Sequence, residues 1–343
     1  MPTDASDLPA VTYVMPVLNE ADAVGAAVAS VLDQDYPAAQ EVVLALGPST
    51  DGTDEVVAGI VADNPAVRTV ANPATDIPAG LNRAIAAARH PVIVRVDAHT
   101  QLPPGYTRRM VSTLLATGAA NVGGVMRARG ATAFQRAVAR VYNSPLGLGG
   151  GVYHGRGEAG PADSAYLGVF RREVLEEVGG YDESLRRGED YELNQRIRGA
   201  GHLVWFDPDV DVAYWPRRGW SPLARQMWAT GTWRGELVRR QGRSSPRYLA
   251  PPLLVLGLGA AVAGLAGLAA GGPVWLAVTF VPPVAYAGFL GYAGSALGGH
   301  GVAERGLDAA VLAVTHLSWG AGFLKGWANG AGGTVDTSRL RPA

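Results

Sequence analysis

The chain has 343 residues, a formal net charge of −1 and 17% charged residues. Its length favours roughly two domains, and its balanced charge provides no basic face of the kind that binds nucleic acid. Because the sequence contains no cysteine, it can form neither a disulfide framework nor a thiolate metal site. The N-terminus, MPTDASDLPA, has acidic residues where an export signal has basic ones, so we expect no cleavable signal peptide.

Strands and helices alternate along the first third of the chain. Apolar runs predict strands at 11–17, 41–46, 67–70 and 92–96, and helical periodicity predicts helices between them. We expect Asn19 to cap the first helix, with Asp22 in its first turn. Alternation at spacings of about 25 residues or fewer is the pattern of a right-handed, parallel, doubly wound sheet. The first strand is followed by MPVLNE instead of GxGxxG, which argues against a dehydrogenase-type dinucleotide fold.

The order is looser after this region. We predict helices at 107–115, 134–142 and 221–239, and strands at 121–126, 165–170, 203–206 and 210–215. The glycine-rich segment 147–155 contains no lysine or Ser/Thr that would complete a phosphate-loop pattern. It is therefore either a flexible lid or acceptor loop, or a backbone cradle for phosphate.

Polar side chains follow the buried strand at 92–96. Asp97 and His99 come directly after it, just before the break at Pro103-Pro104-Gly105. Ligands of open α/β sheets collect at this carboxyl edge. A carboxylate and an imidazole two positions apart can face one divalent cation, although a strand that simply ends in a polar turn would look the same.

Two adjacent acids, Glu189 and Asp190, open a predicted helix that runs to Arg198. Acids at this position can be no more than a favourable interaction with the helix dipole. They also lie where a general base could be presented to the sheet edge.

The C-terminal part is membrane-like. Between Arg247 and Glu304 there is no Asp, Glu, Lys or Arg, and the stretches 251–270 and 273–297 are each long enough to cross a bilayer. Pro282-Pro283 should kink the second span. The stretch 307–327 is either a third crossing or an interfacial helix. Arginines precede the first span, which predicts a multi-pass protein of the cell membrane with residues 1–240 in the cytosol and residues 241–343 forming the membrane region.

In this order the motifs resemble the family 2 glycosyltransferases of the GT-A fold, most closely the succinoglycan-type membrane-associated glucosyltransferases. The resemblance covers about residues 11–240 and implies a mixed, doubly wound α/β sheet followed by membrane helices. The family's nucleotide-sugar site matches a set of residues in the first half of the chain: Pro16, Asn19, Glu20, Ser49, Asp51, Asn82, Arg83 and Asp97. Leu46 stands where the family usually has an acid that contacts the base, so Asp51 is expected to take over part of that contact.

The resemblance also implies roles for the remaining motifs. Asp97-Ala98-His99 occupies the place of the family's Asp-x-Asp metal site, with Mn²⁺ or Mg²⁺ as the cofactor. Glu189-Asp190 matches the family's Glu-Asp pair, in which the Asp is the usual base. A weaker match concerns the acceptor and diphosphate region, namely Arg217, Gln226, Trp233 and Arg234.

These matches predict an inverting transfer of a sugar from a nucleotide-diphosphate donor to a hydroxyl of a lipid-linked glycan at the bilayer, with no nucleic-acid partner, in cell-envelope or exopolysaccharide synthesis. One alternative is a polyprenyl-phosphate hexose synthase, whose phosphate nucleophile needs no base. The other is a membrane scaffold that keeps a nucleotide-sugar fold without catalysis.

Overall fold

The computed structural model describes residues 8–147, 157–242 and 245–335, and these form two compact units. The first unit holds the described residues up to 127 and those from 157 to 214. The second unit holds residues 128–147 and the described residues from 215 onward. Most of the glycine-rich segment predicted to be a lid or a phosphate cradle, residues 148–155, lies outside the described residues.

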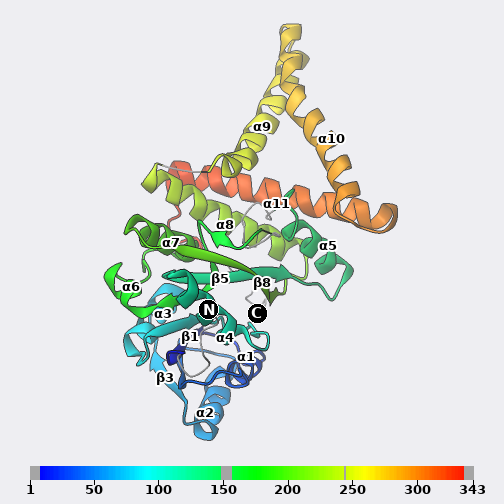
Figure 1. Ribbon diagram of the computed structural model, residues 1–343. Helices are drawn as coiled ribbons and strands as arrows, with labels where there is room; N and C mark the ends of the chain where they lie inside the picture. The colour runs from blue at the N-terminus through cyan, green and yellow to red at the C-terminus, as the bar shows by residue number, and fades with distance from the viewer. Residues whose placement is uncertain (1–7, 148–156, 243–244, 336–343) are drawn as a thin grey trace. The chain divides into compact units, whose positions relative to one another are not determined.

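The first unit is built on one mixed sheet. Its described strands number eight, in the order β3-β2-β1-β4-β7-β5-β8-β6 (Figure 1). The strands β3 (Val67–Ala71), β2 (Gln40–Leu46), β1 (Val11–Val17) and β4 (Val92–Arg95) pair in parallel. The next strand, β7 (Tyr166–Arg171), is antiparallel to β4 and to β5 (Asn121–Ala128). The mixed sheet implied by the family resemblance is therefore confirmed, while simple alternation predicted only its parallel half.

The helices of the first unit lie close to their predicted positions, whereas the short strand β6 was not predicted. The helices are α1 (Val24–Leu32), α2 (Thr53–Asp63), α3 (Ile77–Ala87), α4 (Tyr106–Thr117), α6 (Arg172–Glu177) and α7 (Glu189–Gly199). The two strands predicted at 203–206 and 210–215 are one continuous strand, β8 (Val204–Tyr214), which pairs with the short β6 (Gly160–Pro161). Pro208 lies within β8 and does not interrupt the strand.

The predicted cap of the first helix is wrong. Helix α1 begins at Val24 with Ala23 at the N-cap position, and no side chain caps it. Asn19 instead has a left-handed backbone (φ 54°), which asparagine tolerates better than most residues. Its Oδ1 accepts a hydrogen bond from the backbone N–H of Thr50 at 2.8 Å. The side chain therefore joins two loops instead of starting a helix.

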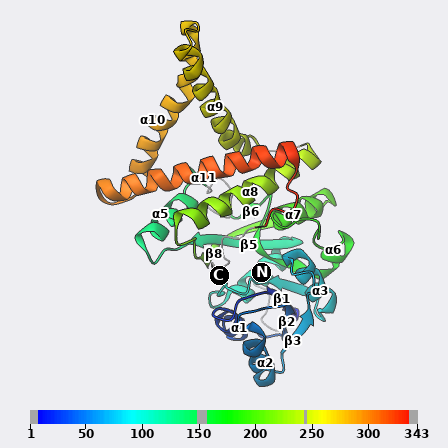
Figure 2. The ribbon, with the colours of Figure 1, turned by 180° about the vertical axis from the view of Figure 1, so that it is seen from behind.

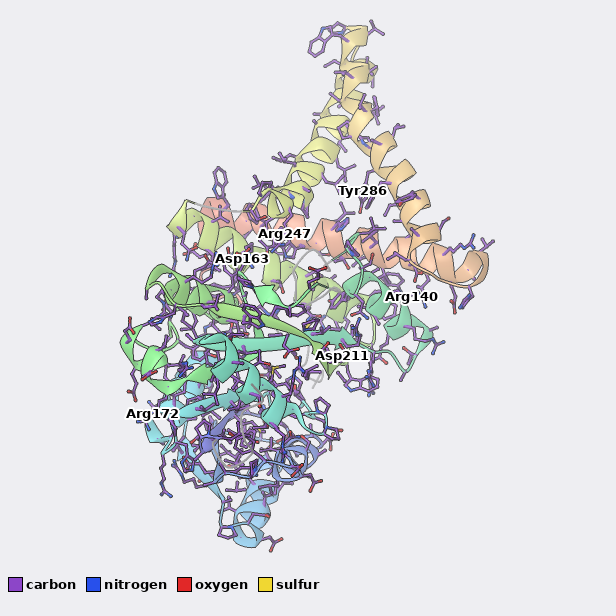
Figure 3. All side chains as sticks on the ribbon, viewed as in Figure 1. Arg140, Asp163, Arg172, Asp211, Arg247 and Tyr286 are labelled. Carbon is purple, nitrogen blue, oxygen red and sulfur yellow. The ribbon has the colours of Figure 1, made fainter. Side chains whose placement is uncertain are left out.

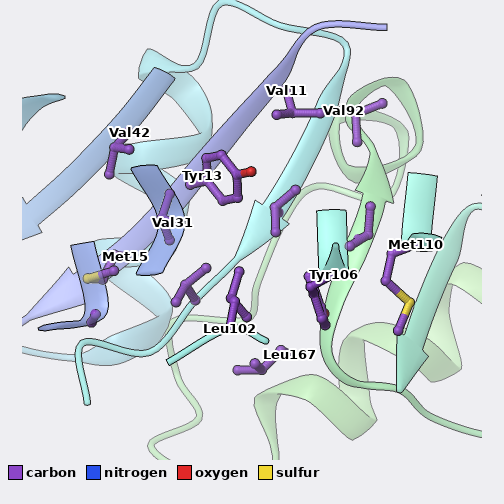
Figure 4. Packing of buried hydrophobic residues seen from close by; sticks show 14 of the residues in the cluster. Val11, Tyr13, Met15, Val31, Val42, Val92, Leu102, Tyr106, Met110 and Leu167 are labelled. Carbon is purple, nitrogen blue, oxygen red and sulfur yellow. The ribbon is translucent and has the colours of Figure 1, made fainter. Parts of the chain in front are cut away.

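The main core of the first unit lies between the parallel half of the sheet and helices α1 and α4. Tyr13 and Met15 of β1 are fully buried there, in one cluster with Val31 of α1 and with Tyr106 and Met110 of α4 (Figure 4). Alternate residues of β1 point to the other face, where Val14 joins a second cluster under α3 and α7. The parallel half of the sheet is thus buried on both sides.

The second unit is helical in its described part. It contains α5 (Ala133–Tyr142), α8 (Trp220–Gln241), α9 (Ala250–Ala269), α10 (Val281–Ala296) and α11 (Gly301–Asn329), with 3₁₀ turns at Pro246–Leu249 and Val274–Phe280. Within this unit α8 and α11 lie side by side, and α9 and α10 form a hairpin that extends away from α11 (Figures 1 and 2).

Three stretches of the described chain are long and apolar enough to cross a membrane: Pro246–Ala269, Val274–Ala296 and Gly301–Asn329. Pro282 and Pro283 lie in the first turn of α10, just after a 3₁₀ turn changes to α-helix at Val281, and the kink expected there stays a prediction. Helices α5 and α8 cluster with the C-terminal helices, although α5 and all but the last residue of α8 lie before residue 241. The division into domains at residue 240 remains a prediction about where the bilayer begins.

Candidate active site

The loops that follow β1 and β2 are tied together at the carboxyl edge of the sheet. The backbone N–H of Asn19 donates to Ser49 Oγ at 3.1 Å, and the N–H of Ala21 donates to Asp51 Oδ2 at 3.2 Å. Thr53 donates to the other oxygen of Asp51, and this bond, together with backbone N–H donors, lowers the pKa of that carboxyl. The side chains of Asn19, Ser49 and Asp51 therefore hold these two loops together through hydrogen bonds with backbone N–H groups.

A buried arginine lies at the end of β4. Arg95 is only 4% exposed, and its guanidinium faces three carboxylates. Both Nε and Nη2 lie 3.3 Å from Asp97 Oδ1, and Nη2 donates to Glu189 Oε1 at 3.2 Å. The third contact is a hydrogen bond from Nη1 to Asp190 Oδ1. The planar fork of arginine suits it to such a site, because its five donors can serve several acceptors at once.

Helix α7 presents both acids from its first turn. Its N-cap residue, Gly188, has a left-handed backbone (φ 78°), a conformation that glycine adopts without the strain of a Cβ. Glu189 and Asp190 are thus placed at the positive end of the helix dipole. Their contacts with Arg95 bring the predicted base and the predicted metal-site carboxylate to one cation.

The electrostatics single out Asp190. Burial raises its pKa, and the charges of Glu189 and Asp97 add to that rise, while the Arg95 guanidinium opposes it; the resulting pKa is about 8. Burial is the largest cause of this rise, and the local charges add to it because one buried cation faces three carboxylates. A carboxyl whose pKa lies near neutrality is matched to proton transfer at physiological pH.

Tyr181 forms one wall of this cluster. Its ring lies under the Arg95 guanidinium, 5.7 Å from Cζ to the ring centroid, at a distance typical of cation–π contacts. Burial raises the pKa of its hydroxyl. Asn82 of α3 holds this tyrosine in place, because its side-chain amide donates to the Tyr181 carbonyl at 2.9 Å and accepts from the Tyr181 N–H at 2.8 Å. The side chain of Asn82, which we expected to contact the nucleotide, therefore holds the backbone of Tyr181 in this structure.

His99 contacts a different acid, with its Nδ1 2.9 Å from Glu20 Oε1. A carboxylate at Nδ1 favours the tautomer that carries its hydrogen there, which leaves the Nε2 lone pair for a metal. No group of three or more His, Asp or Glu side chains among the described residues could hold a metal ion by itself. Asp97 and His99 could supply two ligands, so a cation held by them would need its other positions filled by groups from outside the protein.

The remaining predicted residues are not part of this cluster. Pro16 is half-buried on β1, next to Gly80, and Arg83 is exposed on α3. The four acceptor candidates all belong to the second unit. There Gln226 accepts from the Tyr142 hydroxyl at 3.3 Å, and the Trp233 indole donates to the Thr334 carbonyl at 2.9 Å. The Arg234 guanidinium lies 4.3 Å from the Tyr248 ring centroid, and Arg217 is buried.

Sequence reasoning missed Arg95 and Tyr181. The signal for Arg95 was present, because one arginine interrupts the apolar strand Val92-Ile93-Val94-Arg95-Val96. A charge in a strand buried on both faces needs a partner. Tyr181 gave no comparable signal, since a tyrosine after two glycines reads as an ordinary turn.

Comparison with known proteins identifies the family. The profile described as Glycosyl transferase family 2 matches residues 12–179. The chain is 35% identical over 314 residues to the succinoglycan biosynthesis protein ExoA of Rhizobium meliloti (strain 1021), covering 90% of this chain and 92% of that protein. The chain belongs to glycosyltransferase family 2. It is also 27% identical over 232 residues to glycosyltransferase AglE of Haloferax volcanii, covering 66% of this chain and 73% of that protein.

The fold is similar to that of a solved mannosyltransferase. Mannosyltransferase PcManGT from Pyrobaculum calidifontis, in complex with GDP-Man and Mn²⁺, aligns with a TM-score of 0.65 at 22% identity, covering 95% of this chain and 89% of that one. The prediction of a GT-A sheet followed by long apolar helices is thereby confirmed.

Proposed function

We propose that this glycosyltransferase moves a sugar from a nucleotide-diphosphate donor to a hydroxyl of a lipid-linked glycan, with inversion at the anomeric carbon. The observation that carries the proposal is the contact of Asp190 and Asp97 with one guanidinium, that of Arg95. This contact supports the proposal because it holds the proposed general base, Asp190, beside Asp97, the proposed metal-site carboxylate.

Asp190 is the general base of this proposal. The acceptor oxygen attacks the anomeric carbon as its proton passes to the Asp190 carboxylate, a new C–O bond forms, and the bond to the donor phosphate oxygen breaks. Single displacement needs no covalent sugar intermediate. Glu189 shares the guanidinium of Arg95 and contributes charge that keeps the pKa of Asp190 raised.

Asp97 and His99 would hold Mn²⁺ or Mg²⁺, which supplies Lewis-acid screening of the charge that develops on the leaving diphosphate. Glu20 orients the His99 ring, and Arg95 fixes the Asp97 carboxylate. Arg217 and Arg234 are further candidates for binding diphosphate or acceptor, with Gln226 and Trp233 beside them in sequence.

Pro16, Asn19, Ser49, Asp51, Asn82 and Arg83 are proposed to line the nucleotide-sugar site through the loops and helix that carry them. The relatives support the choice of substrates. ExoA is a succinoglycan biosynthesis protein, and PcManGT is solved with GDP-Man and Mn²⁺. Long apolar helices on the same chain favour an acceptor held in the bilayer, and the arginines before them favour a cytosolic catalytic domain in the cell membrane.

The test is a donor screen with purified full-length protein, Mn²⁺ and a lipid extract of the native membrane, in which released nucleotide and product mass are measured. A lipid-linked glycan that gains one sugar supports the proposal. A polyprenyl monophosphate sugar as product, formed equally well by Asp190→Asn, would establish the synthase alternative. Calorimetric binding of nucleotide sugars without any turnover would establish a non-catalytic scaffold.

A further inference from the structure

Helix α11 packs against α8 at backbone contact. A Cβ added to Gly326 of α11 would lie 1.9 Å from the Thr232 carbonyl oxygen of α8. In the other direction, a Cβ on Gly231 of α8 would lie 2.0 Å from the Trp319 carbonyl oxygen of α11. Gly235 and Gly322 make equally close approaches. Contacts of this kind at successive turns make the two helices one rigid pair.

An ion pair joins the first half of α11 to helix α5. Asp308 of α11 is fully buried and accepts hydrogen bonds from Arg140 of α5, at 2.7 Å from Nη2 and 2.9 Å from Nε. Figure 3 labels Arg140 below α11. A bidentate pair with a fully buried carboxylate is costly to break, because it would leave an unpaired charge. Wherever α11 lies, α5 and α8 therefore lie with it.

The partners of α11 are too charged for hydrocarbon. On α8, Arg225 is exposed, Arg239 and Arg240 are 49% and 43% exposed, and both of the latter bind the buried Glu236. Charged side chains of this kind are rare in lipid-facing helices and lie at the water interface instead. If α11 crossed the bilayer, the arginines of α8 would enter it too.

Helices α9 and α10 are different. In their most apolar 18-residue windows, 17% and 0% of residues are buried against protein, compared with 44% for α11. Large apolar side chains such as Leu253, Val262 and Val284 are more than 60% exposed on them. These two segments have the exposed apolar surface of lipid-facing spans, while much of the apolar surface of α11 is buried against other helices.

Exposed tryptophans mark the level at which the α8–α11 pair lies. Trp220 and Trp228 of α8 are 44% and 41% exposed, Trp215 just before α8 is 50% exposed, and Trp327 near the end of α11 is 55% exposed. Tryptophan with an accessible ring is typical of the headgroup region. Trp275, 67% exposed in the turn between α9 and α10, is placed to reach the opposite headgroup region.

We propose that the α8–α11 pair lies in the interface on one side of the bilayer, with its tryptophans and arginines among the lipid headgroups. Of the described helices, only α9 and the Val274–Ala296 segment cross. The end of α11 is therefore on the same side of the membrane as α8. The inference concerns membrane topology and is independent of the reaction that the protein catalyses.

The natural absence of cysteine allows a direct test. Single cysteines are introduced into the full-length protein at exposed positions: Gln241→Cys at the end of α8, Ala270→Cys in the hairpin turn, Asn329→Cys at the end of α11 and Val335→Cys beyond it. A membrane-impermeant maleimide is added to right-side-out and to inverted membrane vesicles. We expect Asn329→Cys and Val335→Cys to react from the same side as Gln241→Cys, and Ala270→Cys from the opposite side.

Labelling of both C-terminal cysteines from the side of Ala270→Cys would show that α11 crosses, and would overturn the proposal. Each variant is also labelled after detergent solubilisation, so that an unreactive cysteine is not mistaken for a sequestered one. As a second readout, a spin label at Ser318→Cys, in the middle of α11, is expected to report headgroup depth. A depth near the bilayer centre would contradict the proposal even if one topology variant failed to insert.

Discussion

Arg95 and Asp190 are 95 positions apart in the chain, and the guanidinium Nη1 of the first donates to the carboxylate Oδ1 of the second. Strand β4 supplies the arginine and helix α7 the acid, so the contact joins the parallel half of the sheet to a helix that lies between β7 and β8 in the chain. The same guanidinium also binds Asp97 and Glu189. Its charge keeps Asp190 ionisable in a buried, acid-rich setting.

Replacing this arginine should therefore weaken the base through its pKa. An opposite charge at this range lowers a carboxyl pKa by about 1–3 units, so Arg95→Met should raise the pKa of Asp190 further. At neutral pH the ionised fraction, and turnover with it, should fall by about 10- to 10³-fold. The measurement is kcat against pH, and activity should recover in part at high pH.

The controls for this variant separate folding from catalysis. Arg108→Met, which breaks an exposed pair with Asp35, should keep wild-type turnover. Arg95→Lys keeps the charge without the planar fork and should fall between wild type and Arg95→Met. If Arg95→Met retained nucleotide-sugar binding and showed an unshifted pH profile, the role assigned to Arg95 would be wrong.

The wild-type enzyme should show the raised pKa of Asp190 directly. A general base must be deprotonated, so kcat/KM should increase with pH and level off above about 8. Asp190→Asn should lower turnover by about 10²- to 10⁴-fold and abolish this inflection. Glu173→Gln, an exposed acid on α6, is the matched control. Turnover of Asp190→Asn within a few-fold of wild type would remove Asp190 from the mechanism.

The Glu20–His99 contact predicts a metal effect from a residue that does not bind the metal. A carboxylate that orients a ligand histidine typically contributes about 10- to 100-fold to metal affinity. Glu20→Gln should therefore raise the Mn²⁺ concentration needed for half-maximal activity by that factor, with kcat largely restored at saturation. Glu55→Gln, exposed on α2, should have no effect.

Removal of the metal completes this test. EDTA should abolish turnover of the wild type, and Mn²⁺ should restore it. Activity that persists in the chelator would exclude the assignment of Asp97 and His99 as ligands.

Much of the first unit could be predicted because its strands are continuous apolar runs. Strand β1 was predicted with its observed ends, and β2, β3 and β4 to within one residue. The positions of Asp97 and Asp190 at the sheet edge followed from the same periodicity and from the family resemblance. The order of the antiparallel strands did not, because pairing of β7 with β4 is set by contacts distant in sequence.

The site's internal contacts were beyond sequence reasoning for a related reason. Asparagine is a common N-cap residue, so the sequence favours a cap at Asn19. The structure shows that its side chain instead accepts a hydrogen bond from Thr50, in the loop after β2. His99 reads as a metal ligand, and its contact with Glu20 depends on two loops 79 residues apart. Local patterns predict which residues gather at an edge, whereas the choice of partner depends on tertiary packing.

A buried acid away from the site should make stability depend on pH. Asp207 of β8 is 1% exposed and accepts from Arg109 at 2.7 Å and from Thr113 at 2.7 Å. Burial alone would raise its pKa, but these bonds and a backbone N–H outweigh burial and lower it. The ionised form is therefore favoured by folding, and its contribution is present above the ordinary pKa of about 3.9 and lost as pH falls below it.

Asp207→Asn should accordingly reduce the free energy of unfolding by about 1.5–3 kcal/mol at pH 7. The difference in free energy of unfolding between this variant and the wild type should become smaller at acidic pH. The measurement is the thermal unfolding midpoint in detergent across pH. Asp209→Asn is the matched control, because Asp209 binds the same arginine but is 67% exposed, and it should cost less than about 1 kcal/mol. Equal losses from both variants would contradict the argument from burial.

The backbone contact between α8 and α11 makes opposite predictions for two glycines on one helix. At Gly326 a Cβ would meet the Thr232 carbonyl at 1.9 Å, while at Gly306 nothing lies within 4 Å. Gly306→Ala should be neutral or should stabilise by up to about 1 kcal/mol, because alanine loses less backbone entropy in a helix. Gly326→Ala must push the helices apart and should destabilise by about 1–3 kcal/mol. Thermal midpoints in detergent that moved in the same direction for both variants would show that α8 and α11 are not in contact at Gly326.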